Sequence, residues 1–187
     1  MKDLAIFIKE RVHIPEHHLQ TILSSFQEKE IARDKYLVKK GQFVNSYYFI
    51  QSGALRLYLD KGDKQFTVWL AFENDFFTEL NSVSSGTPTN FNIQAIGDTS
   101  LLTIEKGRMD ELYKQIPAWQ QFGRIIWEEA FLKVVNGILS HQTMTAEERY
   151  RQMMNQSDLL QKVPLKQLAS YLGITQTSLS RLRKSIR

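Results

Sequence analysis

The stretch YYFIQSGALRLYLDKGDKQFTVWLAF, residues 47–72, predicts three short β-strands joined by tight turns. Its apolar segments are rich in β-branched and aromatic residues, which fit the pleated surface of a sheet. Turn residues separate these segments at Ser52-Gly53 and at Lys61-Gly62-Asp63. The predicted strands are Tyr47–Gln51, Ala54–Leu59 and Gln65–Phe72.

Segments of the same kind lie on both sides of this stretch. Glu30–Val38 precedes it, and Phe91–Ile96 and Ser100–Ile104 follow it. Glycine turns occur between them, for example at Lys40-Gly41 and Gly97-Asp98. Short strands at regular spacing are typical of a sandwich or a double-sheet jelly roll. We therefore expect the middle of the chain to form a β jelly roll.

Helical periodicity flanks the predicted sheets. Apolar residues recur at three- and four-residue spacing over residues 3–27, with Pro15 marking a break. A short helix is predicted at Lys106–Gln115, ahead of Pro117, and a long helix at Trp119–Gln142. The predicted fold class is α+β: an N-terminal jelly roll with flanking helices, a long helix, and a small helical segment at the C-terminus.

The long helix carries two apolar stripes, whereas a surface helix needs only one. One stripe is Ile125, Leu132, Val135 and Leu139, and the other is Trp127, Phe131, Val134 and Ile138. Two stripes indicate that one packs on the sheet domain and the other on the same helix of a second copy. The alternative is a central helix buried within a single chain.

Composition narrows the class of protein. The chain has no cysteine, which excludes disulfides, thiolate clusters and a cysteine nucleophile. It has no apolar run long enough to span a membrane and no secretory signal at its N-terminus, so we expect a cytoplasmic protein that does not contact a membrane.

Positive charge gathers at the C-terminal end. Residues 141–187 contain eight Lys and Arg and three acidic residues, so their net charge is +5. The whole chain has a net charge of +4, so the remaining residues carry −1. A basic end on a nearly neutral body indicates a polyanionic partner such as nucleic acid. The other interpretation is a solvated charged tail.

The segment LKQLASYLGITQTSLSRL, residues 165–182, has the pattern of a helix-turn-helix. Ala169 is small enough to lie where two helices cross, and Gly173, four residues later, tolerates the positive φ of the turn. Thr175 is a suitable N-cap for the second helix. The residues expected in the shared core are Leu168, Leu172, Ile174, Leu179 and Leu182.

A second helix of this kind enters the major groove, so its exposed side chains are the predicted DNA-binding residues. Arg181 suits a bidentate contact to guanine, and Gln176 suits adenine or a phosphate. Short hydroxyls suit phosphates or a thymine edge, and Arg183, Lys184 and Arg187 suit the backbone or solvent. The predicted DNA-binding set is Thr175, Gln176, Thr177, Ser178, Ser180, Arg181 and Lys184.

The order of jelly roll, long helix and helix-turn-helix resembles the Crp/Fnr family of bacterial transcription regulators. Lys40-Gly41-Gln42 and Tyr48–Gly53 look like the first two glycine turns of that family, and Arg181–Lys184 fits the end of its recognition helix. The resemblance implies a DNA-binding homodimer that reads a palindromic site, under possible control by a small ligand. It also implies RNA polymerase as a partner.

Residues 74–80, 86–88 and 94–95 resemble the phosphate-binding cassette of the family. Glu79 matches the glutamate that binds a ribose hydroxyl, whereas Thr78 replaces a glycine and Thr89 replaces the arginine that binds the cyclic phosphate. The loss of that arginine disfavours cyclic AMP and leaves a different ligand, or none. A carboxylate at a helix start is the other interpretation of Glu79. The ligand-binding residues implied are Phe77, Thr78, Glu79, Leu80, Thr89 and Asn90.

The expected domains are a sensor domain over residues 1–118, a dimerisation helix over 119–143 and a DNA-binding domain over 144–187. The chain ends at Arg187, so we expect no full β-hairpin wing after the recognition helix. One alternative is a ligand-binding module whose degenerate helix-turn-helix contacts protein. An enzyme is the other: no histidine lies between Leu19 and Ser140 to bind a metal as in cupins, and no catalytic residue or metal ligand is assigned.

Overall fold

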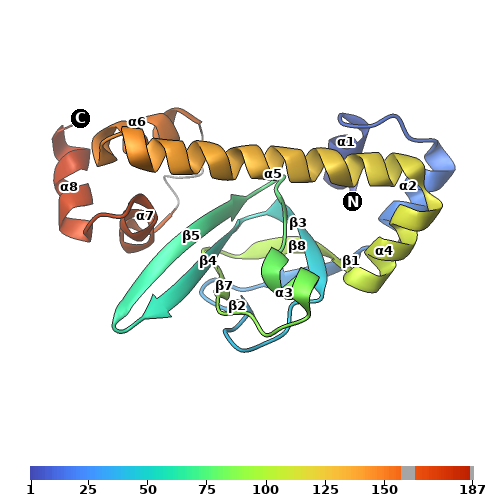
Figure 1. Ribbon diagram of the computed structural model, residues 1–187, viewed down its shortest axis with the longest axis horizontal. Coiled ribbons are helices and arrows are strands. Elements are labelled where there is room, and N and C mark those ends of the chain that lie inside the picture. The colour runs from blue at the N-terminus through green and yellow to red at the C-terminus, as the bar shows by residue number, and fades with distance from the viewer. Residues whose placement is uncertain (157–162, 186–187) are drawn as a thin grey trace.

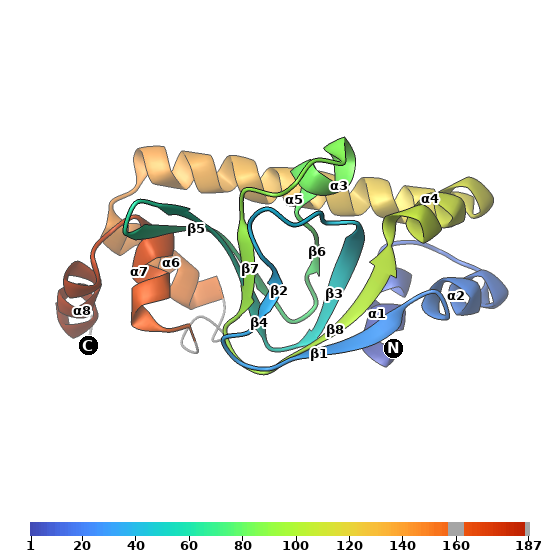
Figure 2. The same ribbon diagram turned by 90° about the horizontal axis from the view of Figure 1, so that it is seen from below.

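The protein is built on two four-stranded antiparallel sheets that face each other as a jelly roll (Figure 2). The computed structural model describes residues 1–156 and 163–185. The strand orders are β1-β8-β3-β6 and β2-β7-β4-β5. The strands are β1 (Gln27–Ile31), β2 (Tyr36–Val38), β3 (Ser46–Ser52), β4 (Ala54–Lys61), β5 (Lys64–Phe72), β6 (Phe76–Phe77), β7 (Asn92–Ala95) and β8 (Thr99–Glu105).

Alternation along the strands fills the space between the sheets. Ile50 of β3 is paired with Leu101 of β8, and Leu55 of β4 is paired with Ala95 of β7. All four side chains are fully buried. Each large aliphatic side chain removed from water contributes about 1.5–3 kcal/mol, so this core holds the two sheets together.

Eight helices surround the jelly roll and extend from it in the part of the chain that the structure describes. They are α1 (Lys2–Lys9), α2 (Glu16–Leu23), α3 (Leu80–Ser85), α4 (Lys106–Gln115), α5 (Pro117–Thr143), α6 (Ala146–Gln156), α7 (Leu165–Leu172) and α8 (Gln176–Ser185). Helix α5 runs along the whole length of the molecule, with α1, α2 and α4 near its start and α6, α7 and α8 near its end (Figure 1). The predicted fold class is confirmed in its jelly roll, long helix and C-terminal helices.

The structure differs from the predictions in three places. The break expected at Pro15 is confirmed, since α1 ends at Lys9 and Pro15 is the N-cap of α2, but Gln27, expected in the helical region, already begins β1. The strand expected at Glu30–Val38 is β1 and β2, because Asp34 has a φ of 62° and turns the chain between them. The two-residue strand β6 and the helix α3 were not predicted, since neither has a periodic apolar pattern.

Helix α5 begins at Pro117, which fits the first turn of a helix, since its missing N–H is not needed there. Gly123 of α5 lies against Tyr113 of α4: a Cβ at this position would come within 2.5 Å of the tyrosine oxygen. The glycine therefore lets α4 pack closely on α5. No helix among residues 1–156 and 163–185 is both long and apolar enough to cross a membrane.

Candidate nucleic-acid interface and ligand cassette

Helices α7 and α8 pack against each other across a tight turn. Gly173 ends α7 in the left-handed conformation, with a φ of 73°, and the Ile174 N–H donates to the Ala169 carbonyl at 3.0 Å. Ala169 and Leu179 are buried where the two helices meet. The turn residue and the small residue are thus used as the sequence pattern predicted.

The start of α8 is fixed by Thr175. Its Oγ1 accepts a hydrogen bond from the Ser178 N–H at 3.1 Å, and the two hydroxyl oxygens lie 2.8 Å apart. Such a cap satisfies one of the free N–H groups of the first helical turn. Both hydroxyls are exposed at the start of α8, and both already take part in the contacts that cap the helix.

Six of the seven predicted DNA-binding residues are exposed, and four of these take no part in the cap: Gln176, Thr177, Arg181 and Lys184. Within the described residues, none of the four makes a side-chain hydrogen bond or ion pair. Ser180 is half-buried. These four side chains present one amide, one hydroxyl and two cations to solvent.

Arg183 differs from its neighbours. Its guanidinium lies over the Tyr150 ring of α6, 5.8 Å from the ring centroid, and the side chain is half-buried. This contact helps hold α8 on α6, so Arg183 is less available to a DNA backbone than the exposed Lys184. Arg187 lies outside the described residues.

Helix α6 starts with a reciprocal pair of caps. The Thr145 N–H donates to the Glu148 carboxylate at 2.7 Å, and the Glu148 N–H donates to Thr145 Oγ1 at 3.2 Å. These hydrogen bonds lower the pKa of Glu148. Arg149, one residue later, donates to the carbonyls of Met144 and Leu172, which ties the start of α6 to the end of α7.

In the predicted cassette, Glu79 serves as the N-cap of α3. Its carboxylate accepts hydrogen bonds from the N–H groups of Asn81 at 3.0 Å and Ser82 at 3.2 Å. The residue is only 4% exposed. Both carboxylate oxygens are therefore occupied by the helix start, as the second interpretation of Glu79 expected.

The threonines of the cassette are also occupied locally. Thr78 donates its hydroxyl to the Ser46 carbonyl at 2.8 Å. Thr89 is buried, and its Oγ1 accepts from the Phe91 N–H at 3.0 Å. Residues 74–95 contain no Lys or Arg at all. The cassette thus supplies no cation to a phosphate.

The other predicted ligand-binding residues are divided between the interior and the surface. Phe77 is buried in the main core and pairs with Tyr48 of β3. Leu80 and Asn90 are exposed. The polar side chains of this segment are thus engaged in capping and turn contacts within the segment and with β3.

The first half of α5 is packed onto the sheet domain. Trp119, Phe122 and Ile126 are buried, and the rings of Trp119 and Phe122 stack at 4.5 Å between centroids. These side chains join the core that contains α1 and β3. Of the residues of the predicted stripes, Ile125 and Trp127 are partly buried against the same core.

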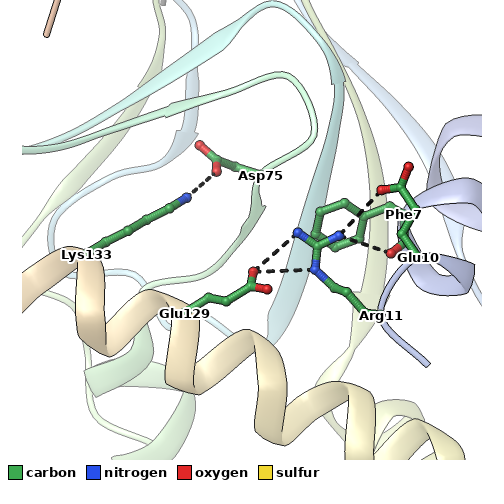
Figure 3. Close-up of polar contacts among 6 residues, drawn as sticks. All are labelled: Phe7, Glu10, Arg11, Asp75, Glu129 and Lys133. Atoms are coloured by element: carbon green, nitrogen blue, oxygen red, sulfur yellow. Dashed lines mark hydrogen bonds and ion pairs between the residues drawn. The ribbon is translucent and has the colours of Figure 1, made fainter. Parts of the chain in front are cut away.

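Two ion pairs follow this packed half of α5 (Figure 3). Arg11, beyond the end of α1, donates to the Glu129 carboxylate at 3.3 Å while its guanidinium lies over the Phe7 ring. One helical turn later, Lys133 donates to Asp75 at 2.9 Å. Asp75 is itself held in the turn before β6, where it accepts from the Phe72 N–H.

From Phe131 onward the large apolar residues of α5 are exposed, except Val135, which is half-buried. Phe131 is 67% exposed and Leu132 is 59% exposed, and both predicted stripes are represented. One side of this part of the helix lines a pocket together with residues of β5, α6 and α7, but the large exposed apolar residues do not line it. The exposed large apolar residues are Phe131, Leu132, Val134, Ile138 and Leu139.

Comparison with known proteins agrees with the sheet domain. Residues 28–116 match the cyclic nucleotide-binding domain family. The human cyclic nucleotide-gated channel alpha-3 is 28% identical over 152 residues, which are 79% of this chain and 20% of the channel. The chain therefore spans about a fifth of that relative's length. The matched family is a ligand-binding domain and not an enzyme family.

Two solved structures share the fold over most of the chain. A CooA mutant from Carboxydothermus hydrogenoformans is 20% identical, with a TM-score of 0.70 over 88% of this chain and 78% of the other. FixK2 from Bradyrhizobium japonicum is 17% identical, with a TM-score of 0.75 over 86% of this chain and 84% of the other. The likeness therefore shows that the fold is shared over more than four fifths of this chain.

Proposed function

We propose that this protein is a DNA-binding transcription regulator of the Crp/Fnr type, and that it acts as a homodimer. The observation that carries the proposal is the exposed face of α8, where Gln176, Thr177, Arg181 and Lys184 have no partner among the described residues. A capped helix with a polar, basic outer face is what major-groove recognition requires. The fold shared with regulators of this type supports it.

In the proposed complex, α8 is the recognition helix. Arg181 reads a guanine through two parallel hydrogen bonds, and Gln176 reads an adenine or holds a phosphate. Thr177, Ser180 and Lys184 contact the DNA backbone, as do the capping hydroxyls of Thr175 and Ser178. RNA polymerase is the proposed partner of the DNA-bound protein.

The second copy covers the exposed half of α5. Five large apolar side chains face solvent there, although the residues before them on the same helix are buried. Apolar positions on a helix with no intramolecular cover favour pairing with another helix. A two-fold axis along α5 would present two copies of α8 to a palindromic site.

For the sheet domain we propose that cyclic AMP is not the ligand. Its phosphate would find no cation in residues 74–95, and the Glu79 carboxylate is taken up by the start of α3. We expect millimolar cyclic AMP to leave the thermal unfolding midpoint unchanged. A midpoint that rises with ligand concentration would contradict this part of the proposal.

The test of the function is selection of bound sequences from a random pool of double-stranded DNA, with the wild type beside Arg181→Ala. We expect a two-fold symmetric motif whose half-sites lie about one helical turn apart. The variant should lose about 1–3 kcal/mol of binding free energy and relax the preference at one base of each half-site.

Arg124→Ala is the matched control, because Arg124 is an exposed arginine on α5 that pairs only with Glu128 in the described residues. It should keep the full motif. A pool that stays unenriched with the wild type would contradict the proposal and favour the alternative, a sensor module that contacts protein through α7 and α8.

A further inference from the structure

Helix α7 is hydrogen-bonded to the free edge of a sheet more than 100 residues away in the sequence. Strand β5 is the last strand of its sheet, so one row of its backbone groups has no neighbouring strand. Ser170 of α7 lies on this edge. Its Oγ accepts from the Thr67 N–H at 2.9 Å and donates to the Gln65 carbonyl at 2.7 Å.

A hydroxyl suits this position because it both donates and accepts. The Gln65 carbonyl and the Thr67 N–H are the successive groups that another strand would otherwise pair with. One serine satisfies both, and it does so at a single place along the strand. The two hydrogen bonds therefore fix where α7 lies along β5.

Apolar contacts extend this attachment. One buried cluster contains Leu70 of β5 and Ile96, which follows β7, together with Leu168 and Leu172 of α7 and Leu179 of α8. The core of the helix pair is thus continuous with the outer face of the sheet. Apolar packing is tolerant of small rotations, whereas a pair of directional hydrogen bonds is not.

We propose that Ser170 is a positioning residue for DNA recognition: it holds α7, and through α7 the recognition helix α8, in one orientation on the sheet domain. The inference rests on the proposed function of α8. In a dimer joined through α5, the orientation of each α8 on its own sheet domain sets the separation of the two recognition helices. Ser170 would therefore determine which half-site spacing the protein accepts.

The experiment measures affinity for a series of DNA duplexes that carry the selected half-sites at the preferred spacing and at one and two base pairs more and less. Wild type, Ser170→Ala and Ser170→Thr are compared, since threonine keeps the hydroxyl. Ser185→Ala is the matched control, because the Ser185 hydroxyl donates to the Leu182 carbonyl within α8 and not to the sheet. A duplex with one half-site reports on α8 alone.

We expect the wild type, Ser170→Thr and Ser185→Ala to bind the preferred spacing at least tenfold more tightly than the others. Ser170→Ala should bind all spacings within about threefold of one another and should bind the single half-site as the wild type does. An unchanged spacing preference in Ser170→Ala would overturn the proposal. An equal loss of affinity on every duplex would also overturn it, since that indicates a merely structural role.

Hydrogen exchange in the absence of DNA separates this inference from the proposed function. The Thr67 amide should exchange roughly fivefold faster in Ser170→Ala than in the wild type, because it loses its only acceptor on that side. Faster exchange in Ser170→Ala, together with a wild type that binds no DNA, would support the attachment of α7 and reject the function. Unchanged exchange of the Thr67 amide would reject the attachment itself.

Discussion

The two halves of α5 have the same kind of sequence and opposite surroundings. From Pro117 to Glu129 the large apolar side chains, Trp119 and Phe122 among them, are buried or partly buried against the jelly roll. From Ala130 to Thr143 residues of the same size are exposed, although the helix continues without a break. The difference is that the large apolar side chains of the first half join the core of the sheet domain, whereas those of the second half do not.

This contrast explains why α5 has two apolar stripes. A helix that needed only one buried face would carry polar residues wherever the sheet ends. Here the apolar residues continue past Lys133, the last residue of α5 that forms an ion pair with the sheet domain in the described part of the chain. The exposed apolar residues of the second half would therefore be covered by a second copy, whereas those of the first half are already covered by the sheet domain.

The largest effect is expected from Phe122→Ala in the first half. Removal of a fully buried aromatic ring that stacks on Trp119 should lower the free energy of unfolding by about 3–5 kcal/mol. Urea denaturation at fixed protein concentration measures this change. The association of folded chains should be unaffected, and a loss smaller than 1 kcal/mol would contradict the role of this half as core.

Leu132→Glu in the second half should weaken the association of the chains and not their folding. A carboxylate placed in a helix pair leaves a buried charge without a partner, so dimerisation should weaken on the order of 100-fold or more. Sedimentation velocity over a concentration series measures this, and binding to a two-half-site duplex should weaken with it.

Gln121→Glu is the control for this change, since Gln121 is exposed in the first half of the same helix. It adds the same charge and should leave association unchanged. Equal behaviour of the two variants would show that the exposed stripe is not an interface.

The smallest effect is expected from Lys133→Ala at the junction of the two halves. Its ion pair with Asp75 is more than half exposed on the lysine side, and such pairs contribute about 0–1 kcal/mol. Unfolding in urea should shift by no more than this, and high salt should reduce the shift further. A loss above 2 kcal/mol would mean that the pair, and not the packed half, holds α5 in place.

Local sequence rules were sufficient where the structure depends on neighbours in the chain. Pro117 after Gln115 marked the end of α4, Thr145 and Glu148 marked the start of α6, and Gly173 marked the turn before α8. Each of these signals acts within four residues through a cap or a fixed dihedral angle. The strands of the jelly roll were predicted for a similar reason, because alternation and glycine turns are local.

Features that depend on distant partners could not be predicted in the same way. The hydrogen bonds of Ser170 with β5 join residues 103 and 105 positions apart, and nothing around Ser170 in the sequence indicates an edge strand. Glu79 was equally ambiguous, since a glutamate before a short helix fits both a ligand contact and a cap. Only the bonds to Asn81 and Ser82 distinguish the two.

Sedimentation equilibrium of the wild type, alone and with a duplex that carries two half-sites, tests the central claim most directly. The chain has a mass of 21.8 kDa, so a dimer has twice that mass. We predict the dimer mass in the absence of DNA and two chains per duplex in its presence. A protein that remains a single chain in both conditions would contradict the account, because the exposed half of α5 would then have no second copy to cover it.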